Sequence, residues 1–357
     1  MTYLKQILPA LARAADRHEI GIVLSPQYQC GIIAGLPPKI RLEAADLPAG
    51  ALGKRWWYQQ TELPRLVRHR RADVLFAVSE AAYSRVPARL VILARNPSIY
   101  AGLQESAAGA WATLRHRALR QPGVFLSLQR ADRVVFVSAA FRDEVAPRMR
   151  LRREKTRVVH HGVSDRFCEA GPPGTPAGET PYVLAVSNIS GHKNYETLLR
   201  AFASLNAPGV ELRIAGGPVD TRAAESLTQL ARELRLESRV KFLGEVGYED
   251  LPLLYRRALV FVLPSRVETF GHPLVEAMAS GTPVIASNLP VCREICENAA
   301  LFFSATSAEE LRSRIQTVIS DPKLRASLAA DGLRRAKSFS WEKSAEGLLA
   351  VFEELAN

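Results

Sequence analysis

Two glutamates, Glu268 and Glu276, flank a glycine turn at residues 271–273, between a strand-like apolar run and a helical pattern. The apolar run covers residues 260–263 and the helical pattern covers residues 274–280. Unpaired N–H groups at the start of such a helix, together with the helix dipole, favour an anion or a sugar oxygen. A carboxylate in the first helical turn can also accept hydrogen bonds from both hydroxyls of a ribose. These residues therefore indicate a sugar-nucleotide site, and an acid-rich helix start is the structural alternative.

A lysine lies in a second loop between a strand and a helix. Lys193 belongs to residues 187–194, which follow a strand-like run at residues 182–186 and precede a helical pattern at residues 195–205. A cation at such a junction can bind phosphate, although most lysines are ordinary solvated surface residues. Lys193 is therefore a candidate for the phosphate side of the same site.

Two further strand-like runs, at residues 212–215 and 240–243, lead directly into glycines. In a parallel sheet, ligands bind at the edge formed by the carboxyl ends of the strands. Both segments also fit plain turns, and neither forms the G-x-G-x-x-G fingerprint of a dinucleotide-binding domain. Gly216, Gly217 and Gly244 are therefore candidates for backbone that a ligand approaches closely.

The longest motif resembles the signature of the retaining glycosyltransferases of family 4, also called glycosyltransferase group 1. The matching letters are E-T-F-G at residues 268–271 and E-A-M-A-S-G-T-P-V-I-A at residues 276–286. The resemblance is strong over residues 182–303 and looser before them. It implies the GT-B fold, an α/β architecture in which two Rossmann-like domains with parallel sheets face each other across a cleft.

The resemblance also implies roles for individual residues. The residue matching Glu276 holds the donor ribose, the one matching Glu268 lies beside the transferred sugar, and the one matching Lys193 neutralises the departing diphosphate. Many relatives carry an arginine at the place of Asn188, so this phosphate site has one charge fewer. The expected catalytic residues are thus Glu268 and Lys193, and the expected donor-binding residues are Asn188, Lys193, Gly216, Gly217, Gly244, Glu268, Phe270, Gly271, His272, Pro273, Leu274, Val275 and Glu276.

The length of 357 residues and a hydrophobic fraction of 47% suffice for two domains with separate cores. Glycine and proline crowd residues 169–181, which predicts a linker between an acceptor-side domain at residues 1–168 and a donor domain at residues 182–340. Apolar runs alternate with helical patterns on both sides, as in parallel α/β sheets. By resemblance, residues 341–357 form a helix that crosses back to the first domain.

The beginning of the chain departs from the family pattern. Relatives begin with a strand and a glycine-rich loop, whereas this chain begins with a helical pattern at residues 2–12. We therefore expect the first strand of the N-terminal domain to be missing, through a start codon assigned about 15–30 residues late. A true truncation is the alternative, and it would favour an inactive sugar-nucleotide-binding partner subunit over an active enzyme.

The acceptor side offers few candidates. Arg95 and Asn96 follow a strand-like run at residues 90–94 and face the cleft in a GT-B layout, so they are candidates for holding a sugar. We expect no metal site and no cofactor, because no carboxylate pair in the sequence requires a metal. We expect the free cysteines Cys30, Cys168, Cys292 and Cys296 to be reduced and buried.

The positive charge of the chain is confined to its first half. Residues 1–170 carry 27 Lys and Arg against 14 Asp and Glu, whereas the remainder carries 20 against 22. The excess favours an anionic membrane surface or a lipid-linked anionic acceptor over a merely solvated arginine-rich face. We expect at least one of Trp56 and Trp57, which lie in this half, to be in the core. Nucleic acid is the other polyanion that a basic chain can bind, but the sequence contains no nucleic-acid-binding module.

The combined prediction is a retaining glycosyltransferase that transfers a sugar from a UDP- or GDP-sugar to a hydroxyl of a glycan or lipid-linked acceptor. The resemblance suggests a role in cell-envelope polysaccharide or lipopolysaccharide synthesis. Because no signal peptide or spanning segment is evident, we expect a cytoplasmic protein, peripheral on the inner face of the membrane.

Overall fold

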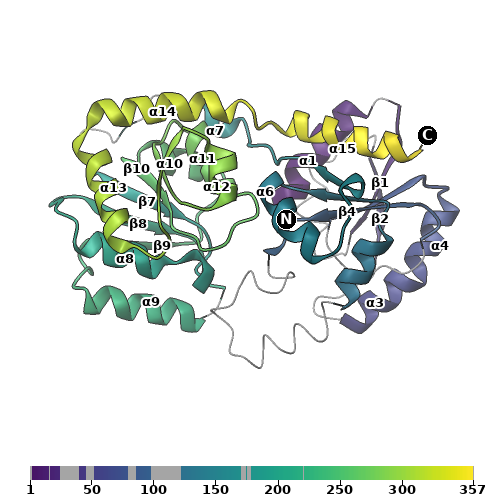
Figure 1. Cartoon of the computed structure of the whole chain (residues 1–357), viewed down its shortest axis with the longest axis horizontal. Coiled ribbons are helices and arrows are strands. Elements are labelled where there is room, and N and C mark those ends of the chain that lie inside the picture. Colours follow the sequence, from purple (N-terminus) through teal and green to yellow (C-terminus); the bar gives the residue numbers. More distant parts are fainter. Residues whose placement is uncertain are drawn as a thin grey trace. The chain divides into compact units, whose positions relative to one another are not determined.

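The structure, a computed structural model, describes residues 2–15, 17–24, 40–45, 52–78, 86–97, 122–169, 174, 178–219 and 221–356. It contains two compact units (Figure 1). Of the described residues, unit 1 holds those up to Gly162 and those from Ser340 onward, and unit 2 holds Val163–Phe339. The division falls before the predicted linker, most of which lies outside the described residues, as does Cys30.

Unit 2 is built on one parallel sheet with the strand order β12-β11-β10-β7-β8-β9. Its strands are β7 (Tyr182–Val186), β8 (Glu211–Ala215), β9 (Val240–Gly244), β10 (Val260–Leu263), β11 (Val284–Ser287) and β12 (Ala300–Phe303). Its α-helices are α7 (Arg166–Glu169), α8 (Tyr195–Ala203), α9 (Thr221–Glu233), α10 (Leu251–Arg256), α11 (His272–Ala279), α12 (Pro290–Cys296), α13 (Ala308–Ser320) and α14 (Pro322–Ala336).

The central strands of unit 2 are continuous apolar runs because helices cover both faces of a parallel sheet. All residues of β10 are buried, and the core around it includes Phe202, Leu212, Phe303 and Ile315. The chain builds outward from β7 through β8 and β9, then returns to place β10 on the other side of β7. The strand order therefore reverses between β7 and β10, and such a switch point is where open α/β sheets bind ligands.

Unit 1 contains a four-stranded parallel sheet in the order β3-β4-β5-β6 and a separate parallel pair, β1-β2. The strands are β1 (Ile20–Leu24), β2 (Ile40–Ala44), β3 (Val74–Ala77), β4 (Arg89–Ala94), β5 (Arg133–Phe136) and β6 (Thr156–Val158). The labelled helices are α1 (Thr2–Ala14), α3 (Leu52–Gln60), α4 (Glu62–His69), α6 (Ala139–Arg148) and α15 (Trp341–Ala356). The helical pattern at the start of the chain is thus present as α1.

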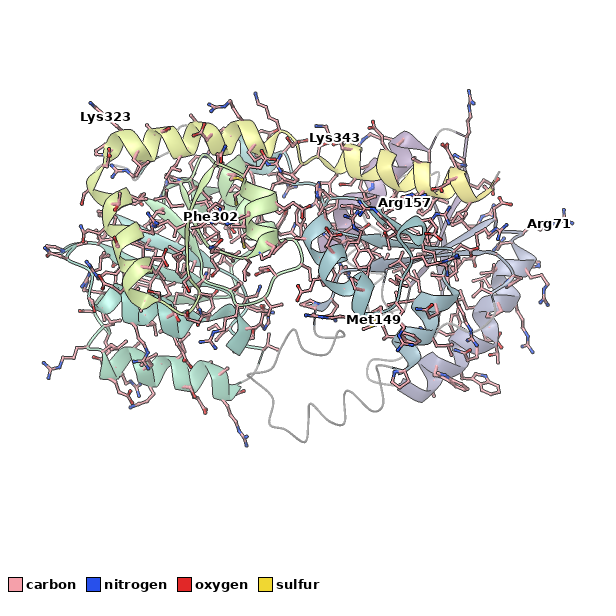
Figure 2. All side chains as sticks on the ribbon, viewed as in Figure 1. Arg71, Met149, Arg157, Phe302, Lys323 and Lys343 are labelled. Atoms are coloured by element: carbon pink, nitrogen blue, oxygen red, sulfur yellow. The ribbon has the colours of Figure 1, made fainter. Side chains whose placement is uncertain are left out.

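The C-terminal helix α15 packs against α1 within unit 1 (Figure 1). Arg157 of β6, labelled beside α15 in Figure 2, forms an ion pair with Glu354 through Nη2 and Oε1, 2.5 Å apart. Arg133 contacts the same carboxylate at 2.5 Å. The last segment of the chain therefore joins the first unit through both packing and charge.

Two sequence predictions about burial were wrong. Trp56 and Trp57 of α3 are 56% and 61% exposed, although α3 packs along α4. Cys168 is exposed, whereas Cys292 and Cys296 are buried free thiols, as expected. The tryptophans are therefore surface residues.

Candidate active site

The two predicted catalytic residues meet at the switch point of unit 2. Lys193 ends the 3-10 turn η4 (Gly191–Lys193) after β7, and Glu268 lies in the loop after β10, so neighbouring strands bring them together. Lys193 Nζ donates to Glu268 Oε1 over 2.6 Å. The two side chains are only 13% and 9% exposed. Since water screens such a pair weakly, the pair is a strong local dipole at the sheet edge where ligands bind.

A third residue of this cluster was not predicted. Ser265, which is fully buried just beyond β10, donates its hydroxyl to the same Glu268 Oε1 over 2.8 Å. That oxygen therefore accepts two hydrogen bonds, which restrict the rotation of the carboxylate. The only sequence signal for Ser265 was its place at the carboxyl end of a buried strand.

Glu276 projects from α11 into a buried site lined by tyrosine. Tyr255 of α10 donates its hydroxyl to Glu276 Oε2 over 3.0 Å. Burial raises the pKa of Glu276 to about 7, and the Tyr255 hydrogen bond opposes that rise. Among the described residues, the structure gives no hydrogen-bond partner to Oε1. Glu276 can therefore accept further hydrogen bonds, as a ribose diol requires.

Helix α11 begins directly after a glycine turn. Gly271, the residue before the helix, has a φ of 80°, and no side chain caps the first turn. A Cβ at Gly271 would lie 2.9 Å from Leu274 Cδ1, the end of a flexible side chain, so glycine is favoured here mainly by the backbone conformation. His272 and Pro273 form the first turn, and the Leu274 N–H donates to the Gly271 carbonyl over 2.9 Å. Because proline has no N–H, what this helix start offers an anion is the positive end of its dipole.

The side chains around this turn point to the interior. Phe270 is buried, with its ring centroid 5.2 Å from that of His272 and 5.8 Å from that of Phe339. Leu274 and Val275 are fully buried. Their expected role in donor binding therefore depends on their backbone.

The expected glycines lie where β8 and β9 end. Gly216 has a φ of 142°, and a Cβ there would lie 2.0 Å from the Ser187 carbonyl oxygen. Its N–H donates to the Gly244 carbonyl over 2.7 Å, so the ends of β8 and β9 are tied together. A Cβ at Gly217 would lie 2.7 Å from Glu245 Cγ. Asn188 is exposed in the neighbouring loop after β7.

The acceptor-side candidates lie in unit 1. Arg95, directly after β4, places its guanidinium carbon 5.3 Å from the ring centroid of Tyr3 on α1. Asn96 is exposed. Within the described ranges, no group of three or more His, Cys, Asp or Glu side chains could hold a metal ion. The acceptor role of Arg95 and Asn96 stays a prediction.

Two known families match the chain, one over its first half and one over its second half, and the sheets of the structure divide in the same way. Residues 2–167 match the family described as "Glycosyltransferase Family 4", and residues 172–335 match "Glycosyl transferases group 1". The chain is 32% identical to an O-antigen chain mannosyltransferase, RfbU, of Salmonella typhimurium over 54% of this chain and 52% of the relative. It is 34% identical to a D-inositol 3-phosphate glycosyltransferase of Rhodococcus erythropolis over 56% and 47%. The matches thus span about half the length of these curated relatives.

Solved structures match over nearly the whole chain. A sucrose-phosphate synthase of Thermosynechococcus elongatus aligns with a TM-score of 0.75 and 24% identity, covering 99% of this chain and 92% of the other. The Anabaena protein HepE, solved in complex with UDP and glucose, aligns with a TM-score of 0.75 and 21% identity, covering 98% and 96%. These structures have the GT-B fold, and the likeness establishes that fold for this chain.

Proposed function

The chain belongs to the family 4 glycosyltransferases of group 1, and we propose that it transfers a sugar from a nucleoside diphosphate to an acceptor hydroxyl. The observation that carries the proposal is the buried Lys193–Glu268 pair at the switch point between β7 and β10. A cation, a carboxylate and the positive end of the α11 dipole supply charges of both signs within one loop cluster. Departure of a diphosphate from a sugar requires such a set of charges.

Each residue of the cluster has a proposed task. The positive end of the α11 dipole and the Lys193 ammonium stabilise the diphosphate as its bond to the sugar carbon breaks. Glu276 binds the ribose, and Glu268 lies beside the transferred sugar. The acceptor oxygen bonds to the same face of that carbon, so the anomeric configuration is retained, and its proton goes to the departing phosphate. The proposed reaction uses no metal and no cofactor.

The proposed substrates follow from the relatives. The two relatives named above are a mannosyltransferase of O-antigen chains and a glycosyltransferase of inositol phosphate, and HepE was solved with UDP. We therefore propose a UDP- or GDP-sugar as donor and a glycan or lipid-linked acceptor of the cell envelope. In this proposal Arg95 and Asn96 bind the sugar acceptor.

Unit 1 offers a surface for an anionic membrane. Exposed Trp56 and Trp57 lie on α3, and Arg68 and Arg71 are exposed on and just after α4; Figure 2 shows Arg71 at the outer edge of unit 1. Tryptophan favours the headgroup region of a bilayer, and arginine is attracted to its negative charge. No helix in the described part of the chain is long and apolar enough to cross a bilayer. We therefore propose peripheral association with the inner face of the cytoplasmic membrane.

The proposal is tested by thermal-shift titration with UDP, GDP and their sugar conjugates, followed by a turnover assay with the donor that binds. A ligand at about 100 times its Kd stabilises the protein by about 2.7 kcal/mol. We expect one nucleotide series to raise the Tm, and Glu276→Ala to lose most of that rise. Control variant Glu309→Ala, at an exposed position on α13, retains it.

Three outcomes are distinguishable. Binding with donor turnover supports a transferase, and binding without turnover favours the inactive partner subunit. The absence of a thermal shift with every nucleotide would overturn both proposals.

A further inference from the structure

Asn194, which ends the loop at residues 187–194 but was not among the predicted site residues, is almost completely buried between η4 and α8. Its φ of 57° and ψ of 35° lie in the left-handed region. That conformation is disfavoured for most residues and tolerated best by glycine and asparagine. The backbone here would therefore accept a glycine, and the presence of an asparagine directs attention to its side chain.

The side-chain amide of Asn194 forms hydrogen bonds with three partners. Its Nδ2 donates to the Pro264 carbonyl over 2.9 Å and to the Ala305 carbonyl over 2.8 Å. Its Oδ1 accepts the Thr197 hydroxyl over 2.9 Å. The side chain thus joins the loops that follow β7, β10 and β12.

These bonds lie immediately beside the Lys193–Glu268 pair. Asn194 follows Lys193 in the chain, and its partner Pro264 precedes Ser265, the residue that donates to Glu268. On the other side of Lys193, the His192 carbonyl accepts the Arg266 N–H over 2.8 Å. The backbone of Lys193 is therefore tied to the Glu268 loop at both of its neighbours.

We propose that Asn194 is a positioning residue for sugar transfer, whose side chain holds Lys193 against Glu268. The proposal rests on the proposed function for its catalytic consequence. The claim that Asn194 positions Lys193 depends only on the three hydrogen bonds of the Asn194 side chain. Glycine would preserve the backbone conformation but leave two carbonyls without their donor, and aspartate would present an acceptor where both carbonyls need a donor. Among these residues, only asparagine supplies the conformation, the two donors and the acceptor together.

The first test measures the position of Lys193 without requiring turnover. The protein and its Asn194→Gly variant are treated with a limiting amine-acylating reagent, and modification of Lys193 is quantified by mass spectrometry relative to exposed Lys241. In the native protein Lys193 is shielded by burial and by its ion pair. We expect its relative reactivity to rise severalfold in Asn194→Gly.

A matched variant separates positioning from general destabilisation. Asp321→Ala removes a helix cap from α14, where the carboxylate accepts the Lys323 and Leu324 N–H groups, and it belongs to no loop of the site. Such a cap contributes about 1 kcal/mol. We expect Asp321→Ala to leave Lys193 reactivity unchanged. Equal Lys193 reactivity in native protein and Asn194→Gly, or an equal rise in both variants, would overturn the proposal.

The second test concerns catalysis. If the native protein turns over donor, Asn194→Gly should lower kcat by about tenfold to a hundredfold, because small misplacements of catalytic groups have effects of this size. The donor Kd should change less than kcat does, because Glu276, which binds the ribose in this proposal, is not held by Asn194. An unchanged kcat would contradict the positioning role. If the native protein shows no turnover, the proposed function fails, while the labelling result still decides whether Asn194 places Lys193.

Discussion

Glu276 is a carboxylate whose ionisation is coupled to its burial. Burial raises its pKa from 4.5 to about 7, even though Tyr255 donates a hydrogen bond to it. At neutral pH the ligand-free protein therefore contains both the protonated and the ionised form. A ribose diol donates two hydrogen bonds and favours the ionised form, so donor binding and ionisation are thermodynamically linked.

The raised pKa predicts how stability depends on pH. Because the folded pKa exceeds the unfolded value, the contribution of Glu276 is fully present below pH 4.5 and is lost as pH rises through about 7. We expect Glu276→Gln, which cannot ionise, to gain Tm relative to the native protein between pH 5 and pH 8. The measurement is the Tm difference between the two proteins across that range. A constant difference would show that Glu276 does not titrate there.

Sequence reasoning identified some residues of the site and missed others for a definable reason. Lys193 and Glu268 belong to recognisable motifs, and their 2.6 Å contact was implied only by the fold. Tyr255 and Asn194 act through hydrogen bonds to partners far away in the chain, namely Glu276 for Tyr255 and the Pro264 and Ala305 carbonyls for Asn194. Such partners carry no local periodicity or spacing, so the sequence offered no signal for the roles of Tyr255 and Asn194.

At the scale of elements, the strand-like runs at residues 90–94, 182–186, 212–215, 240–243 and 260–263 match β4, β7, β8, β9 and β10 within one residue at each end. Short apolar runs bounded by loops are reliable strand signals in a parallel sheet. Helix α11 begins at His272, two positions before the predicted start, because Gly271 with its φ of 80° ends the preceding loop. Its start therefore depends on backbone conformation, which hydrophobic periodicity does not report.

Two glycines at the ends of β8 and β9, Gly216 and Gly244, allow a matched pair of substitutions. Gly216 has a φ of 142°, and an added Cβ would collide with the Ser187 carbonyl, whereas Gly244 has a φ of 66° and open space around the added atom. We expect Gly216→Ala to lower the free energy of unfolding by about 3 kcal/mol or more. Gly244→Ala should cost about 1 kcal/mol from its backbone alone. Urea denaturation of both variants measures the two costs, and equal costs would contradict this account.

The exposed tryptophans give the membrane proposal a specific test. Alanine at both Trp56 and Trp57 should weaken co-sedimentation with phosphatidylglycerol-containing vesicles, because the aromatic anchors are lost. Arg68→Gln and Arg71→Gln should each cost about 1 kcal/mol of vesicle affinity, and the cost should shrink at high salt. Leu333→Ala, at an exposed apolar residue of α14 in unit 2, is the control and should bind as the native protein does. If the double tryptophan variant binds vesicles as tightly as the native protein does, this surface does not bind the membrane.

At the scale of the whole molecule, unit 2 contains every expected donor-side residue and a core of its own. Its two ends lie together, since the Val163 N–H donates to the Phe339 carbonyl over 3.2 Å. Adjacent ends and a separate core are typical of a segment that folds independently.

We therefore predict that a fragment of residues 163–339 unfolds cooperatively and binds the same nucleotide as the full chain. Its nucleotide Kd should lie within about tenfold of the full-length value, a difference of about 1.4 kcal/mol. Calorimetric titration and thermal unfolding of the fragment measure both properties. A fragment without a cooperative transition would show that unit 2 depends on unit 1.

The sequence by itself determined the α/β class, the family and the charge difference between the two halves, because these follow from local periodicity, motif letters and composition. Tertiary structure decided that Lys193 and Glu268 share a hydrogen bond, that Glu276 is buried against Tyr255, and that Trp56 and Trp57 are exposed. The physical reason is that burial and ion pairing depend on neighbours supplied by distant segments. In unit 2 those neighbours are set by the reversal of strand order between β7 and β10.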